Sequence, residues 1–121
     1  IYSDVRSPKV TQLRAKPLAS LVFWSEALNW QLRVQVSATV DDNSAARDRI
    51  WSQLKDRPAP VDYLSLNAPG SPLIKGLVGQ ASGHSLCLLR FKVRSMDWLS
   101  LSRSGHQRAQ LSDGQLIACV P

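Results

Sequence analysis

Hydrophobic and polar residues alternate strictly between Gln31 and Val40, and this is the clearest periodic pattern in the chain. The apolar positions lie two residues apart: Leu32, Val34, Val36, Ala38 and Val40. The polar positions lie between them: Gln31, Arg33, Gln35, Ser37 and Thr39. A period of two is typical of a strand with one buried and one solvated face. The bulky apolar run 18–24 predicts a buried strand, and residues 25–29 predict the turn that joins both strands in a hairpin.

Two helices are predicted on either side of this hairpin. Ser7 and Pro8 form a typical helix start, with Ser as the cap and Pro at the first helical position. This helix ends before Pro17 and is expected to turn three apolar residues inward: Val10, Leu13 and Ala15. Residues 41–44 offer several caps for a second helix, which runs to about Lys55 with apolar residues at helical spacing: Ala46, Ile50, Trp51 and Leu54.

The rest of the chain is predicted to be mainly strand. A short helix over 61–66 precedes a loop over 68–83 that is rich in Gly and Pro. Three strands follow, separated by a break at Gly105 and a turn at 112–114: residues 85–101, 106–111 and 115–120. Strands that follow each other closely favour a mainly β, mostly antiparallel sheet or small barrel with helical insertions, forming a single domain over 1–121.

Composition and charge exclude some classes of protein. The chain has 121 residues, of which 44% are hydrophobic and 20% charged, an ordinary globular balance. The net charge of +6 favours anionic partners, but the basic residues are scattered, so we expect no nucleic-acid binding. No apolar run approaches the roughly 20 residues that span a bilayer, so no membrane segment is expected.

The cysteines and the first residues suggest where the protein resides and how it begins. Cys87 and Cys119 each lie in an apolar run, which is typical of buried free thiols in a reducing, cytoplasmic protein. The chain starts at Ile1 without Met, and its first three residues resemble the end of a strand. We therefore expect the domain to be incomplete at its N-terminus.

Most chemical motifs are absent, and three groups of residues remain as candidates. The chain has no glycine-rich phosphate loop and no nucleophile elbow, and His84 with Cys87 is too few ligands for a metal. A strand end and a helix start carry groups that suit a phosphate, or simple helix capping: Ser3, Ser7 and Lys9. The polar face of the long strand, or an ordinary solvated face, carries Gln31 and Arg33 beside Trp30. The third group spans a strand and a turn, and its members could equally be a core Trp and an exposed turn: Trp98, His106 and Arg108.

These three groups resemble the pyridoxamine 5'-phosphate oxidase family. Residues 1–9 read I-Y-S-D-V-R-S-P-K and are similar to the family segment F-Y-T-N-x-x-S-R-K. Residues 29–34 read N-W-Q-L-R-V and are similar to the family strand N-R-Q-V-R-V. Trp98, His106 and Arg108 match the C-terminal pattern W-x7-H-x-R. The three matches occur in order and span nearly the whole chain.

The resemblance implies an FMN-binding split barrel, a homodimer with flavin at the subunit interface. Four residues would then hold the FMN phosphate or ribityl chain: Tyr2, Ser3, Ser7 and Lys9. Gln31 would contact the edge of the flavin ring, and Trp98 and Arg108 would contact it from the partner subunit. Arg57 and His106 match substrate-binding positions. The family's first barrel strands would lie upstream of Ile1.

Several positions depart from the family pattern. Pro8 stands where the family has Arg, and Ser104 replaces a substrate-binding Arg. In the substrate-phosphate signature Y-F-x-S-R-P followed by Ser, the Arg57-Pro58 pair remains, but Gln53 and Val61 replace the Tyr and the final Ser. Lost hydrogen-bonding partners weaken the binding of a phosphate ester.

The resemblance thus implies an FMN-binding flavoprotein, an oxidoreductase acting on a small molecule that could carry a phosphate. A genuine pyridoxamine 5'-phosphate oxidase with an altered pocket is one alternative. A barrel that binds flavin or another ligand without turnover is another.

Overall fold

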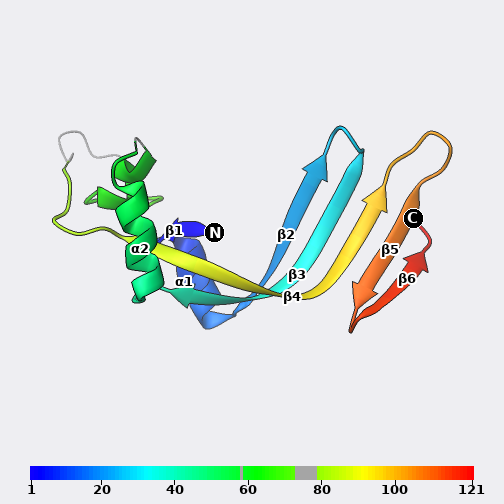
Figure 1. Ribbon diagram of the computed structural model, residues 1–121, viewed down its shortest axis with the longest axis horizontal. Coiled ribbons are helices and arrows are strands. Elements are labelled where there is room, and N and C mark those ends of the chain that lie inside the picture. The colour runs from blue at the N-terminus through cyan, green and yellow to red at the C-terminus, as the bar shows by residue number, and fades with distance from the viewer. Residues whose placement is uncertain (58, 73–78) are drawn as a thin grey trace. The chain divides into compact units, whose positions relative to one another are not determined.

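The computed structural model describes residues 1–57, 59–72 and 79–121 (Figure 1). Its elements are, in chain order, β1 (Tyr2–Asp4), α1 (Pro8–Ala15), β2 (Leu18–Ser25), β3 (Trp30–Asp41), α2 (Ala45–Leu54), the 3-10 helix η1 (Ala59–Leu64), β4 (Leu86–Ser100), β5 (Gln107–Ser112) and β6 (Gln115–Cys119). The strand order is β2-β3-β4-β5-β6, and β1 pairs with β4. The pairs β1–β4, β2–β3, β4–β5 and β5–β6 are antiparallel. The mainly antiparallel fold class with helical insertions is confirmed.

The chain forms two compact units. The first contains Ile1–Pro17 and Thr39–Arg90, and the second contains Leu18–Ala38 and Phe91–Pro121. The long strands β3 and β4 contribute residues to both units. Part of the predicted loop, residues 73–78, lies outside the described residues, as does Pro58 of the family signature. No helix in the described part of the chain is long and apolar enough to cross a membrane.

In the first unit, α1 packs through one residue near its start. Ser7 occupies the N-cap, Pro8 follows at the start of the helix, and Val10 is fully buried. Val10 shares the core of this unit with four residues of β4: Leu86, Cys87, Leu88 and Leu89. The expectation that Ala15 points inward was wrong, because it lies five positions after Val10, about 140° around the helix, and is exposed.

The second predicted helix forms where expected and is less buried than its pattern suggests. Ser44 caps α2, since its hydroxyl accepts a hydrogen bond from the backbone N–H of Arg47 at 3.1 Å. No residue of α2 is fully buried. The apolar residues at helical spacing are half-buried: Ala46, Ile50, Trp51 and Leu54.

The second unit contains the predicted hairpin. Strands β2 and β3 pair from Leu18↔Ser37 to Ser25↔Trp30. On β3 the predicted apolar face is buried at Val34, Val36 and Ala38, so this alternation is confirmed. The prediction that 18–24 is a buried strand was wrong, since Val22 is 59% exposed and Phe23 and Trp24 are each 54% exposed. Val22 and Phe23 point to opposite faces of the sheet, and β2 ends the strand order, so neither face of β2 is covered there by the residues that the structure describes.

The remaining strands form a meander. Between β5 and β6, Asp113 has φ 51° and Gly114 has φ 77°. Two successive positive φ values are typical of the tight turns whose twist suits an antiparallel hairpin. Both cysteines are free thiols, but only Cys87 is buried as predicted, whereas Cys119 is half-buried near the end of the edge strand β6.

Candidate functional site

Four of the residues predicted to bind a phosphate line one pocket in the first unit. Tyr2 and Ser3 come from β1, whereas Ser7 and Lys9 lie at the start of α1. The pocket has a volume of about 320 Å³, and the other described residues that line it are Asp4, Asp62, Tyr63 and Pro69. We refer to it as the β1–α1 pocket. The structure therefore brings together this part of the predicted site.

The two serines of the β1–α1 pocket are buried residues whose hydroxyls make few hydrogen bonds with the described residues. Ser3 and Ser7 are each 5% exposed. Although Ser7 is the N-cap of α1, its side chain makes no capping hydrogen bond. The Ser3 hydroxyl donates to the carbonyl of Asp4 over a long 3.5 Å. Helix capping therefore does not account for the buried Ser7 hydroxyl.

Of the charged side chains in the β1–α1 pocket, Asp4 has an ion-pair partner, whereas Lys9 has none among the described residues. Asp4 is 6% exposed, and its Oδ2 lies 2.7 Å from Arg6 Nη2 and 2.6 Å from the Ser85 hydroxyl. Burial raises the pKa of Asp4. Hydrogen bonds from Arg6 and Ser85, together with the charge of Arg6, lower the pKa by more than burial raises it, so the net shift is downward. Lys9 is exposed and forms no ion pair with any residue that the structure describes.

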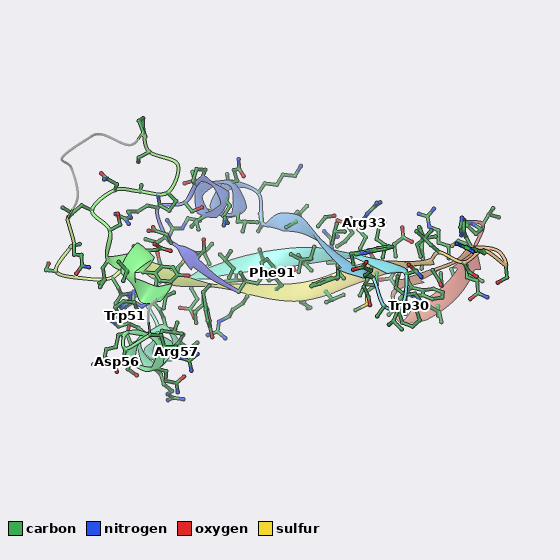
Figure 2. The ribbon with its side chains drawn as sticks, turned by 90° about the horizontal axis from the view of Figure 1, so that it is seen from above. Trp30, Arg33, Trp51, Asp56, Arg57 and Phe91 are labelled. Carbon is green, nitrogen blue, oxygen red and sulfur yellow. The ribbon has the colours of Figure 1, made fainter. Side chains whose placement is uncertain are left out.

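In the second unit, two predicted flavin contacts lie on opposite faces of the sheet. Trp98 packs edge-to-face on Trp30, with ring centroids 5.2 Å apart. Because neighbouring strand residues point to opposite faces, Gln31 lies on the face away from Trp30 and Trp98. Figure 2 shows the same alternation for Trp30 and Arg33. Within one chain, the structure does not bring Gln31 and Trp98 together.

Arg108 is held by an acidic neighbour rather than by Trp98. Its Nη2 lies 2.7 Å from Asp97 Oδ2, and its Nε donates to Asp97 Oδ1 at 2.9 Å. These hydrogen bonds lower the pKa of Asp97 despite partial burial. Arg108 pairs with Leu99 and therefore lies on the face opposite Trp98. The indole N–H of Trp98 is buried and has no hydrogen-bond partner within the described ranges.

The two predicted substrate residues occupy different settings. His106 lies between β4 and β5, and its Nδ1 accepts a hydrogen bond from the backbone N–H of Ser102 at 3.2 Å. It lines a pocket of about 610 Å³ in the second unit, together with Asn29, Leu101, Ser102 and Arg103. We refer to this as the His106 pocket. Arg57 belongs to the first unit, where it is exposed just beyond the end of α2 (Figure 2).

Sequence reasoning missed several residues at these pockets. Asp62 and Tyr63 line the β1–α1 pocket although they lie far along the chain, and no sequence signal links them to it. Arg103 lies one position before Ser104, so it was within reach of the motif that identified His106. Sequence reasoning gave His84 no role, yet in the structure it stacks on Trp51 at 4.3 Å. The described residues contain no cluster of three or more metal-ligating side chains.

Comparisons with known proteins identify solved structures that have the same fold as this chain. No protein-family model matches the sequence, and no curated protein matches it. Among solved structures, a pyridoxamine 5'-phosphate oxidase-related, FMN-binding protein from Nostoc punctiforme matches with a TM-score of 0.75 and 21% identity, over 99% of this chain and 71% of that one.

A second solved structure also matches the fold of this chain. PhzG from Burkholderia lata, in complex with tetrahydrophenazine-1-carboxylic acid, matches with a TM-score of 0.77 and 16% identity, over all of this chain and 67% of that one. Identities this low establish the fold alone. The fold expected from the sequence resemblance is confirmed: this chain has the split-barrel fold of the pyridoxamine 5'-phosphate oxidase-related, FMN-binding proteins.

Proposed function

We propose that this protein is a flavoprotein that binds FMN, with the phosphate and the adjoining ribityl chain in the β1–α1 pocket. The observation that carries this proposal is that Tyr2, Ser3, Ser7 and Lys9 line a single pocket. A volume of about 320 Å³ lies at the lower end of the range for small-molecule sites, roughly 300–1,000 Å³. It suits one end of a nucleotide-sized ligand.

The residues present fit a phosphate ester. Ser7 supplies a buried hydroxyl without a capping bond, Ser3 a second hydroxyl and Lys9 a cation. At the start of α1, Pro8 has no backbone N–H, and the N–H groups of Ser7 and Val10 donate to the carbonyls of Asp4 and Ser7. The helix therefore adds the Lys9 N–H and the positive end of its dipole. Asp62 is the unfavourable charge in this lining, because a carboxylate repels a phosphate.

The remaining roles concern the flavin ring and a second copy of the chain. Bound FMN supplies hydride and electron transfer, whereas the protein supplies binding and orientation. We assign Gln31 to the ring edge and Trp98 and Arg108 to contacts made by the partner subunit in a homodimer. Because Trp98 and Gln31 lie on opposite faces of the sheet, contact by Trp98 from a second chain suits the site better than contact within one chain. Arg108 lies on the face opposite Trp98 and pairs with Asp97, so its assignment rests on the sequence resemblance alone. The exposed apolar residues of β2 also favour a two-fold homodimer, the commonest symmetric assembly.

The substrate is proposed to be a small molecule with an acidic group, bound in the His106 pocket. Since His106 Nδ1 accepts a hydrogen bond, the neutral imidazole carries its proton on Nε2 and can donate from there. Arg103 adds a guanidinium to the same lining. A carboxylate or phosphate group matches these donors, and the PhzG neighbour is bound to a carboxylic acid. Oxidation of such a molecule is the proposed reaction.

The experiment is reconstitution with flavin. Purified protein is mixed with FMN or riboflavin, excess flavin is removed by gel filtration, and retained flavin is measured by visible absorption. We expect retention close to one FMN per chain and much weaker retention of riboflavin. Failure to retain either flavin would refute the proposal, and equal retention would refute the role of the β1–α1 pocket.

Catalytic turnover and oligomeric state are measured on the protein with flavin bound. Anaerobic bleaching of the bound flavin by a cyclic amine that carries a carboxylate would support oxidoreductase activity on an acidic substrate. Bleaching only by pyridoxamine 5'-phosphate would favour the alternative of a genuine pyridoxamine 5'-phosphate oxidase. No bleaching by any substrate would favour a binding protein without turnover. Light scattering that gives a monomer mass with flavin bound would refute the homodimer.

A further inference from the structure

One arginine connects three chain segments around the β1–α1 pocket. Arg6 lies in the turn between β1 and α1, and its Nη1 donates to the carbonyl of Leu66 at 3.1 Å. Its Nη2 donates to the Ser85 hydroxyl at 3.2 Å. The Ser85 hydroxyl donates to the Asp4 carboxylate at 2.6 Å and lies 3.0 Å from the Tyr63 carbonyl. Arg6 thus contacts both the β1 wall and the segment that carries the opposite wall.

The strongest contact of Arg6 is with Asp4. Arg6 Nη2 and Nε lie 2.7 and 3.0 Å from the two carboxylate oxygens, and the Arg6 backbone N–H donates to Oδ1 at 2.8 Å. Asp4 lines the pocket and is nearly fully buried. A buried carboxylate without its partner would be a strong local negative charge. It would repel a phosphate in the same pocket.

We propose that Arg6 is a positioning residue that makes the β1–α1 pocket selective for an anion by neutralising Asp4. This inference rests on the proposed FMN binding and adds a residue outside the set that lines the pocket. Arg6 does not act as a ligand of the phosphate, because its guanidinium is taken up by Asp4, Leu66 and Ser85. Its effect on the ligand passes through the charge of Asp4.

A purely structural role for Arg6 predicts a different result. If the network only held the fold, removing either Arg6 or Asp4 would weaken the binding of FMN and riboflavin alike. Charge neutralisation predicts that Arg6→Met weakens FMN binding, whereas Asp4→Asn does not. It also predicts little change for riboflavin, which lacks the phosphate and contacts the same walls.

The experiment compares four proteins by fluorescence titration with FMN and with riboflavin. The proteins are the wild type, Arg6→Met, Asp4→Asn and the double variant. We expect Arg6→Met to weaken FMN about 30-fold, the low end for stripping one partner from a buried charged pair, and riboflavin less than about threefold. We expect Asp4→Asn to keep or strengthen FMN binding and the double variant to lie within about threefold of the wild type.

Arg14 provides a matched control for the substitution of Arg6. Arg14→Met breaks an exposed ion pair with Asp42 in the same unit and should leave both flavins bound as in the wild type. Equal losses for FMN and riboflavin in Arg6→Met, or a loss of FMN in Asp4→Asn as large as in Arg6→Met, would overturn the inference. If Arg6→Met does not fold, Asp4→Asn and the double variant decide. A wild type that binds no FMN would instead refute the proposed function.

Discussion

Replacing Lys9 by Ala tests the contribution of this cation to the proposed anion site. Lys9 is the only positively charged side chain among the described residues that line the β1–α1 pocket. Ser3 and Ser7 can hydrogen-bond a phosphate but cannot balance its charge. The substitution removes the charge and should leave the core intact, because Lys9 is exposed and the buried residue of α1 is its neighbour Val10.

The expected magnitude follows from the exposure of Lys9. A hydrogen bond to a charged group contributes roughly 1.5–3 kcal/mol. Solvent screens the charge of an exposed lysine, so we expect the lower end, about 1.5 kcal/mol. This corresponds to roughly tenfold weaker binding of FMN, since about 1.4 kcal/mol is a factor of ten in Kd. Riboflavin should bind Lys9→Ala as it binds the wild type.

Fluorescence titration at two salt concentrations provides the measurement. The effect on FMN should shrink at high salt, because salt screens charges at the surface. Lys16→Ala is the matched control, since Lys16 is exposed at the other end of α1 and does not line the pocket. Equal losses for FMN and riboflavin would show that Lys9 acts through folding. No loss for either would show that Lys9 is an ordinary surface residue.

Three further predictions concern other parts of the chain. Burial and the charge of Arg47 lower the pKa of His84, so the fold favours its neutral form, and stability should fall as the pH drops below the ordinary value of 6.5. His84→Phe keeps an aromatic ring against Trp51 and should flatten this fall in thermal melts. Gly114→Ala should cost roughly 1–2 kcal/mol in urea unfolding because of its positive φ, whereas Gly83→Ala, which has open space and no positive φ, should cost little. Gln31→Ala should leave the melting temperature nearly unchanged and shift the spectrum of bound flavin, and a proportional loss of stability would contradict its assignment to the ring edge.

The secondary structure was predictable because its causes are local. The alternation along β3, the cap at Ser44 and the turn at Asp113 and Gly114 depend on residues that are close in sequence. Burial depends on neighbours distant in sequence. The apolar run of β2 looks like a core strand, and only the strand order shows that it lies at an edge.

The site was predictable in part for the same reason. Tyr2, Ser3, Ser7 and Lys9 lie within eight residues of one another, so a strand followed by a helix brings them together. The opposite wall comes from Asp62 and Tyr63, which the chain reaches through long-range packing. Only the arrangement of the strands shows that Gln31 and Trp98 lie on opposite faces.

The exposed edge strand β2 has a consequence for the behaviour of the protein at high concentration. Residues 18–24 read L-A-S-L-V-F-W, seven residues without charge, Pro or Gly, which is the signature of segments that stack into cross-β aggregates. Wherever the proposed homodimer leaves it uncovered, an edge of this kind is a template for such stacking. Lys16 and Pro17 before the segment and Glu26 after it are the residues that natural sequences place as gatekeepers. Substitution of these three residues should therefore shorten the time to aggregation while leaving the pockets unchanged.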